Sequence, residues 1–366
     1  FICVILSLLS IYILEKSLSI NWKQTFVFTF FTILLSSVFL YILFINSEYI
    51  IKKENNFTRR FIPHPISNEK NINLKASTFY FAGNNGDTIF LGNRKAPLLL
   101  TTINPDFKNY KIDTLKISED RHPFKKVELS ILYPNYSIAD GSIPIIFEGK
   151  FPNLHAKKVS QNKFYFTKIK MIAPHQYVIK ATLTKNKKAI LGTINTTNNE
   201  NKINEKILKP QLDGIFDTDG NISFDVLHHN IIYTYLYRNQ YIITDKNLLH
   251  TSTGNTIDTT KIAKLKLYTS SDGITKLAAP PIEVNEFQTV HNYILFNVSN
   301  LKGKFEPHSR WKDSKVIDVY HYQNKSYLYS FYIKNKNNKK TRSILATQNY
   351  FYALIGNDIV RYKRRK

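Results

Sequence analysis

The hydrophobic positions of this chain follow two different patterns. Near the N-terminus, two unbroken apolar runs at residues 1–14 and 25–45 flank a short polar segment. From residue 76 onward, apolar and polar residues alternate in short runs separated by turn residues, as in STFYFAG, NNGD and TIFLGN. Alternation with a period of two predicts half-buried β-strands, and Asn85-Gly86 predicts a tight hairpin turn. The pattern therefore predicts apolar helices followed by a large all-β region.

The second apolar run predicts a helix that spans a membrane. Residues 25–45 contain no charged residue, Pro or Gly. A helix rises about 1.5 Å per residue, so this run matches the ~30 Å hydrocarbon core of a bilayer. Residues 1–15 form a shorter apolar run that ends at Glu15 and Lys16, which we interpret as a truncated helix in a chain that continues upstream. Together they predict a membrane hairpin of two transmembrane helices over residues 1–45.

Residues 46–75 are predicted to be a linker. This segment is polar and contains Pro63 and Pro65, and each Pro favours an extended backbone at the residue before it. The folded domain is then expected to cover residues 76–366.

The strand-like runs recur in groups along the β region. In its second half, paired aromatic strands return every ~40 to 60 residues, which is near the length of a four-stranded propeller blade. We therefore predict a β-propeller of about six blades, in which radial repetition leaves only short sheet edges. Tandem β-sandwiches are the alternative, with a possible junction in TTNNENKINEKILKP at 196–210.

The charge and the cysteine content narrow the function classes. The formal net charge is +24, but the lysines are dispersed, and the one dense basic cluster lies at residues 361–366. Dispersed lysines argue against nucleic-acid binding, whereas a basic surface beside anionic lipid headgroups suits a tethered domain. Cys3 is the single cysteine, which excludes an intrachain disulfide, a Cys-based zinc site and a CxxC redox pair.

Three polar residues are candidates for ligand contact. Arg238, between Tyr237 and Tyr241, could bind a carboxylate or phosphate through its planar guanidinium, or it could stack on a tyrosine. Asp219 lies in DTDGNISFD, which partly imitates a calcium-binding loop but has its Gly at the wrong position, so a tight turn is the preferred interpretation. Asp258, in TIDTT, is expected to cap a turn through backbone amides.

Motifs for chemistry are lacking elsewhere in the sequence. It contains no GxSxG and no Gly-rich phosphate loop. We therefore predict no catalytic residue, no metal site and no cofactor.

Several segments together carry a family resemblance: FYFAGNNGDTIFLGNRKAPLLL, DGIFDTDGNISFD, YRNQYIITDKNLL, GNTIDTT and VIDVYHYQNKSYLYSFYI. They resemble an uncharacterised family of Bacteroidetes membrane-tethered proteins whose soluble part resembles a six-bladed β-propeller. The first apolar run is similar to the last helix of a MauE/DoxX-like membrane bundle. That resemblance implies an inner-membrane protein with a periplasmic domain. The basic residues after the second span, Lys52, Lys53, Arg59 and Arg60, predict the opposite orientation.

The expected function is binding at a membrane. The sequence predicts a membrane-anchored, non-catalytic binding or scaffolding domain for a peptide, protein or glycan of the cell envelope. One alternative is an envelope enzyme whose active site lies in the propeller channel. A third possibility is binding of nucleic acid or anionic lipid through a basic surface.

Overall fold

The computed structural model describes residues 12, 22–53, 55–161, 164–183, 185, 187–198, 200–271 and 275–365. The chain divides into two compact units, Phe1–Asn56 and Phe57–Lys366.

The first unit contains one long apolar helix, α2 (Trp22–Lys53). Its segment Phe26–Ser47 has a mean hydropathy of 2.4, and the side chains are exposed along it. The hydroxyl of Ser36 donates to the carbonyl of Thr32 over 2.7 Å, so this polar group is satisfied within the helix. A membrane anchor and a signal sequence both have these properties.

The described residues contain one candidate membrane span, where the sequence predicted two transmembrane helices. Within the described residues, α2 is the one helix long and apolar enough to cross a bilayer. The other predicted helix, at 1–15, lies outside the described residues.

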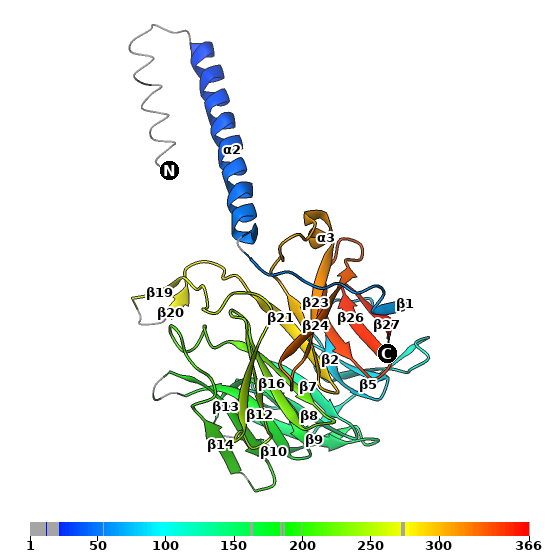
Figure 1. The fold of residues 1–366 in the computed structure, drawn as a ribbon. Coiled ribbons are helices and arrows are strands. Elements are labelled where there is room, and N and C mark those ends of the chain that lie inside the picture. The colour runs from blue at the N-terminus through cyan, green and yellow to red at the C-terminus, as the bar shows by residue number, and fades with distance from the viewer. Residues whose placement is uncertain are drawn as a thin grey trace. The chain divides into compact units, whose positions relative to one another are not determined.

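The second unit consists of six sheets arranged as the blades of a propeller (Figure 1). Blade 1 contains β2 (Phe79–Asn85), β3 (Thr88–Asn93), β4 (Leu99–Ile103) and β5 (Tyr110–Thr114). Blade 2 contains β7 (Val127–Leu132), β8 (Asn135–Asp140), β9 (Ile145–Lys150) and β10 (His155–Gln161), with β6 (Lys116–Ile117) as a short parallel fifth strand. Blade 3 contains β11 (Phe166–Ala173), β12 (Gln176–Thr182), β13 (Ala189–Asn195) and β14 (Glu200–Asn204).

The remaining blades follow the same antiparallel order. Blade 4 contains β15 (Gly220–Asp225), β16 (Asn230–Tyr235), β17 (Gln240–Thr244) and β18 (Thr251–Asn255). Blade 5 contains β21 (Asn285–His291), β22 (Ile294–Ser299), β23 (Ser314–His321) and β24 (Ser326–Lys334). Blade 6 contains β25 (Thr341–Ala346), β26 (Tyr350–Ile355), β27 (Asp358–Arg364) and β1 (Ile66–Asn73). Two insertions, the hairpin β19 (Leu267–Thr269)–β20 (Thr275–Leu277) and the short helix α3 (His308–Lys312), lie in loops before and within blade 5.

The N-terminal strand closes the ring. Strand β1 pairs with β27 at the C-terminus, with Asn73 opposite Asp358 and Lys70 opposite Arg361. The innermost strands β2, β7, β11, β15, β21 and β25 contact one another in that order, and β25 contacts β2. The fold is therefore a six-bladed β-propeller, which confirms the predicted fold class and excludes tandem sandwiches. The predicted linker is wrong over 66–73, because these residues form a blade strand.

The core lies between neighbouring blades, where large aromatic side chains pack against one another. The ring of Phe351 in blade 6 lies 5.3 Å from that of Phe296 in blade 5, and both are buried. Within blade 2, Tyr136 lies across Gly149 on the adjacent strand, and a Cβ at Gly149 would meet the tyrosine ring at 2.2 Å. Tyr241 and Gly254 make the same pair in blade 4. These glycines are needed because each tyrosine ring occupies the space of a side chain.

The chain enters the second unit on blade 5. The carbonyl of Phe57 accepts a hydrogen bond from the amide of Lys304 over 2.8 Å. Arg59 is 6% exposed and binds Asp318 and Glu306, which are also buried. These contacts fix residues 57–59 to the propeller.

Candidate functional site

The six innermost strands surround a central channel with a volume of about 950 Å³. Asn221 donates to the carbonyl of Glu286, and Arg342 donates to that of Phe79, so residues near the beginnings of neighbouring inner strands meet. The inner strands therefore begin at the same end of the channel, which we call the start end. The opposite end is formed by the hairpin turns that follow the inner strands.

The lining of the channel is basic. Five of its lining residues are basic, namely Arg94, Lys125, Lys126, Lys168 and Lys170. Two are acidic, Glu128 and Asp225. Amide and hydroxyl side chains of Asn221, Ser223, Gln288 and Ser343 lie among apolar ones. Such a mixed wall is typical of a binding pocket in which a few polar groups orient a ligand.

Two lysines of β11 dominate the electrostatics of the channel. Lys168 and Lys170 are alternate residues of the strand and so project to the same face of it. Lys168 Nζ donates to Asn221 Oδ1 over 2.6 Å. The side-chain ammonium group of Lys170 forms no hydrogen bond or ion pair with any residue that the structure describes. Burial lowers the pKa of Lys170, although the charge of Glu128 opposes this.

A second charge pair lies beside Lys168. Lys180, on β12 opposite Lys168, is 5% exposed, and its Nζ donates to Asp219 Oδ1 over 2.8 Å. Burial alone would raise the pKa of Asp219, but the charges of Lys180 and Lys168 hold it below its usual value. Burial also lowers the pKa of Lys168, against the attraction of Asp219. The negative charge of Asp219 thus balances the charge of Lys180 and part of the charge of Lys168. No anion contacts Lys170 among the described residues.

Asp140 positions Lys125 and Lys126 at the start end of the channel. Its Oδ2 accepts hydrogen bonds from the backbone amides of Lys125 and Lys126, at 2.7 and 2.8 Å, and its Oδ1 accepts from the Ser142 hydroxyl at 2.6 Å. Burial opposes ionisation, but these hydrogen bonds together lower the pKa of Asp140. The carboxylate therefore holds the segment before β7 against the channel.

The three sequence candidates lie in different places. Arg238 is 1% exposed, its guanidinium lies 3.6 Å from the ring centroid of Tyr235, and it donates to the carbonyl of Lys209. Asp258 is buried and accepts from the amide of Thr260 over 2.9 Å, as a turn cap does. Asp219 is half-buried in the lysine cluster.

None of these three residues lines the channel, and in the described residues no hydrogen bond or ion pair joins any two of them. The stacking and capping roles weighed from the sequence are present for Arg238 and Asp258. Ligand contact by Arg238, Asp219 and Asp258 stays a prediction.

The calcium-like loop separates its carboxylates. Asp217 caps the amides of residues 211, 212 and 214, whereas Asp225 accepts from the Tyr322 hydroxyl over 2.8 Å. Over the residues that the structure describes, no group of three or more His, Cys, Asp or Glu side chains is placed to hold a metal ion.

Sequence reasoning missed the channel lysines. The run KFYFTKIKMI was recognised as a strand, but Lys168 and Lys170 interrupt its apolar face at every second position. Two lysines on one face of a strand inside a buried domain are the signal that could have identified them.

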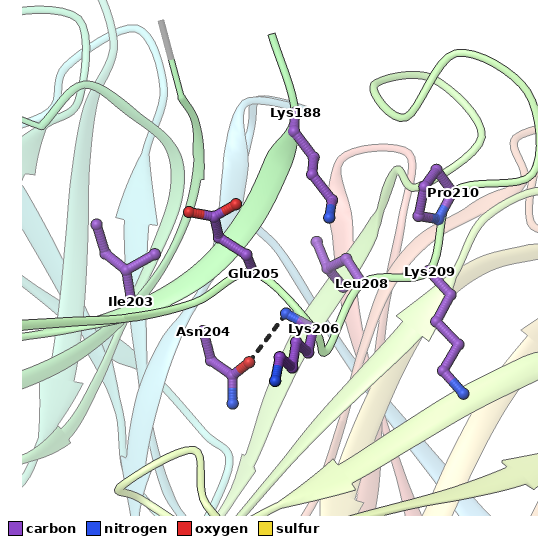
Figure 2. Close-up of a pocket in the computed structure, with 8 residues that line it drawn as sticks. All are labelled: Lys188, Ile203, Asn204, Glu205, Lys206, Leu208, Lys209 and Pro210. Carbon is purple, nitrogen blue, oxygen red and sulfur yellow. Dashed lines mark hydrogen bonds between the residues drawn. The ribbon is translucent and has the colours of Figure 1, made fainter. Parts of the chain in front are cut away.

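A second cavity, of about 720 Å³, lies at the outer edge of blade 3 (Figure 2). Its basic lining residues are Lys188, Lys206 and Lys209, and the last two are exposed. The Lys206 amide donates to Asn204 Oδ1 over 2.9 Å, as Figure 2 shows. Exposed lysines on a loop stay solvated without a ligand, so this cavity is a weaker candidate than the channel.

Comparison with known proteins supports the fold and leaves the family open. No family model and no curated protein sequence matches the chain. Among solved structures, a member of the DUF4221 family from Bacteroides vulgatus has 11% identity, with a TM-score of 0.50 over 86% of this chain and 99% of that one.

Two further similar structures differ in what they bind. Virginiamycin B lyase from Staphylococcus aureus, with quinupristin, has 11% identity and a TM-score of 0.48 over 81% of this chain and 99% of that one. YCF48 bound to a D1 peptide has 8% identity and a TM-score of 0.46 over 84% of this chain and 100% of that one. At such low identities the similarity describes the fold alone. Nothing in these comparisons supports the resemblance to a MauE/DoxX-like bundle.

Proposed function

We propose that this protein is a membrane-anchored, non-catalytic binding protein whose propeller holds an acidic peptide in its central channel. The observation that carries the proposal is Lys170, an ammonium group in the channel wall without a hydrogen bond or ion pair among the described residues. A desolvated charge is costly unless it is paired, so a carboxylate that reaches Lys170 gains a strong, charge-assisted hydrogen bond.

The composition of the channel wall favours a peptide. The carboxamide of Gln288 can bond to a peptide group, because its Oε1 is buried without a hydrogen-bond partner within the described residues. Apolar residues such as Ile131 and Phe287 line the same space and suit the side chains of a peptide. The Lys168–Lys170 pair then selects for acidic residues.

The placement of acid and base groups supports binding without catalysis. Glu128 lies at the start end of its strand, and His291 lies at the opposite end of β21. Asp225 is already engaged by the Tyr322 hydroxyl and the Tyr293 amide. A general acid or base must lie within hydrogen-bond reach of the proton that it transfers.

Helix α2 supports anchoring. Its Phe26–Ser47 segment is apolar and exposed, as a lipid-facing helix is. We infer that the domain lies in the cell envelope at the inner membrane, on the periplasmic side.

Calorimetry on the full chain in detergent micelles tests the proposal. The probes are a hexaglutamate peptide, a hexaglutamine peptide and a hexagalacturonate oligosaccharide. We expect hexaglutamate to bind, hexaglutamine to bind at least about tenfold more weakly, and K170M to lose that preference. The matched control is K157M, which replaces an exposed lysine of β10.

Three results would contradict the proposal. Equal binding of the two peptides would show that charge does not determine binding. Tighter binding of hexagalacturonate would show that the ligand is an acidic glycan rather than a peptide. Cleavage of the bound probe, detected by mass spectrometry, favours the enzyme alternative.

A further inference from the structure

Two loops at the start end of blades 4 and 5 form a surface that is both apolar and basic. They cover residues 256–284 and 300–313, and Figure 1 shows β19, β20 and α3 within them on one side of the propeller. Four large apolar side chains are exposed there: Ile262 (65%), Tyr268 (48%), Ile282 (43%) and Phe305 (82%).

The same loops carry unpaired positive charge. Lys261, Lys264, Lys266, Lys276, Lys304 and Lys312 are exposed, and none forms an ion pair within the described residues. Two carboxylates of these loops are turned inward, because Asp258 caps a buried turn and Glu306 binds buried Arg59, whereas Asp313 is exposed. The surface therefore attracts anions.

Phe305 is the most prominent residue of this surface. Its neighbours are fixed to the propeller on both sides, because the Lys304 amide bonds to the Phe57 carbonyl and Glu306 bonds to Arg59. The backbone of Phe305 has φ 67°, a left-handed conformation that is unfavourable for an aromatic residue. The ring is thus held out in solvent, with Lys304 Nζ 5.3 Å from its centroid.

The covalent connection to α2 identifies the partner. Phe57, which Lys304 contacts, follows the end of α2 at Lys53 by only four residues (57 − 53). This short covalent tether gives the surface a high effective concentration at the membrane that the proposed anchor crosses.

We propose that the surface formed by residues 256–284 and 300–313, called the docking face, binds an anionic lipid bilayer. Phe305 and Ile262 enter the interface, and the lysines pair with acidic headgroups. This inference rests on the proposed role of α2 as a membrane anchor. It also directs the start end of the channel toward the bilayer, so that an acidic peptide enters at the opposite end.

Depth-dependent fluorescence quenching in the full chain tests this docking. The substitutions W22F and W311F remove both tryptophans, and F305W then adds a single reporter on the docking face. L249W is the matched control, since Leu249 is 72% exposed in the turn between β17 and β18, at the opposite end of blade 4. The protein is reconstituted into phosphatidylcholine vesicles with or without phosphatidylglycerol, all containing chain-brominated lipid.

We expect F305W to be quenched at least about twofold in the anionic vesicles and L249W to be unaffected. K304E/K312E should abolish the quenching of F305W. Retention of quenching in that variant, or a fluorescence blue shift without quenching, overturns lipid docking; the blue shift indicates a protein contact instead.

Alkaline carbonate washing separates this inference from the proposed anchor. A protein that stays in the vesicles but leaves F305W unquenched refutes the docking face alone. A protein released by the wash refutes the anchor and the docking face together.

Discussion

Arg59 Nε donates to Asp318 Oδ1 over 2.7 Å, and the two residues are 259 positions apart in sequence. The pair joins the segment that enters the propeller to the centre of strand β23. Ser299 Oγ accepts from Arg59 Nη2 over 2.8 Å, and Glu306 also binds the guanidinium. Each of the three guanidinium nitrogens of Arg59 therefore donates a hydrogen bond inside the protein. Together these contacts fix the start of the propeller to blade 5.

Removal of one partner of this pair should be costly. R59A leaves the buried carboxylates of Asp318 and Glu306 without a cation, so it should lower the free energy of unfolding by about 3–5 kcal/mol. The measurement is urea unfolding followed by circular dichroism. R121A, at an exposed arginine, is the control and should change stability by less than about 0.5 kcal/mol. A loss for R59A as small as that of the control would refute the role of the pair.

Strand β1 should be essential for the ring. A chain that begins at Phe57 keeps the β1–β27 pairing, whereas a chain that begins at Ala76 exposes the edge of β27. We expect the first to unfold in a single cooperative transition and the second to aggregate or to unfold at a much lower temperature. Size-exclusion chromatography and thermal unfolding compare them. Equal stability of the two chains would show that residues 66–73 are only a linker.

The same strand shows why one domain boundary could not be predicted. Strands such as Thr88–Asn93 are buried on both faces, so their apolar residues are visible in the sequence. Strand β1 has the polar sequence ISNEKNIN, because it is the outermost strand of its blade. Its partner strand is far away in sequence, since Asn73 and Asp358 are 285 residues apart. A polar edge strand has no hydrophobic pattern to reveal it, and only its distant partner defines it.

The candidate site was harder to predict than the fold. Arg238 was recognised as a residue that stacks on tyrosine, but its partner is Tyr235, and the contact fills the interior of the protein rather than a ligand site. Lys168, Lys170 and Glu128 come together only because β7 and β11 are neighbours in the ring. Convergence of residues from several blades has no local signature in the sequence.

Lys170 should give the stability of the ligand-free protein a distinct pH dependence. Its pKa in the folded state is lowered from the ordinary value of 10.5, which the unfolded chain retains. The unfolded chain then binds more protons between these two values, so stability rises as the pH increases through this range. K170M should lack this rise and should be about 1 kcal/mol more stable at pH 7. Chemical denaturation from pH 7 to 10 measures the difference between wild type and K170M. Parallel curves would contradict a desolvated lysine in the channel.

The charged form of Asp140 should stabilise the folded protein, unlike that of Lys170. Its pKa in the folded state is lowered by the hydrogen bonds from Ser142, Lys126 and Lys125, which overcome the effect of burial. Its contribution is therefore fully present above the ordinary pKa of 3.8 and is lost as the pH falls through the lowered value. D140N should destabilise the protein by about 1–3 kcal/mol at pH 7 and weaken hexaglutamate binding, because Lys125 and Lys126 lose their support. Unfolding at pH 7 and pH 3 measures the stability, and calorimetry at pH 7 measures the binding of hexaglutamate. D120N, at an exposed aspartate, is the control, and an equal effect of the two substitutions would refute the role of Asp140.

Zero-length cross-linking locates the peptide most directly. A carbodiimide joins carboxylates of a bound hexaglutamate peptide to nearby lysine amines, and mass spectrometry of the digested protein identifies the lysines. The account predicts cross-links of an isotope-labelled hexaglutamate probe at Lys170 and Lys168. These labelled cross-links should disappear when excess unlabelled hexaglutamate is added. Cross-links at the exposed lysines of the docking face, with none at Lys168 or Lys170, would contradict binding in the channel.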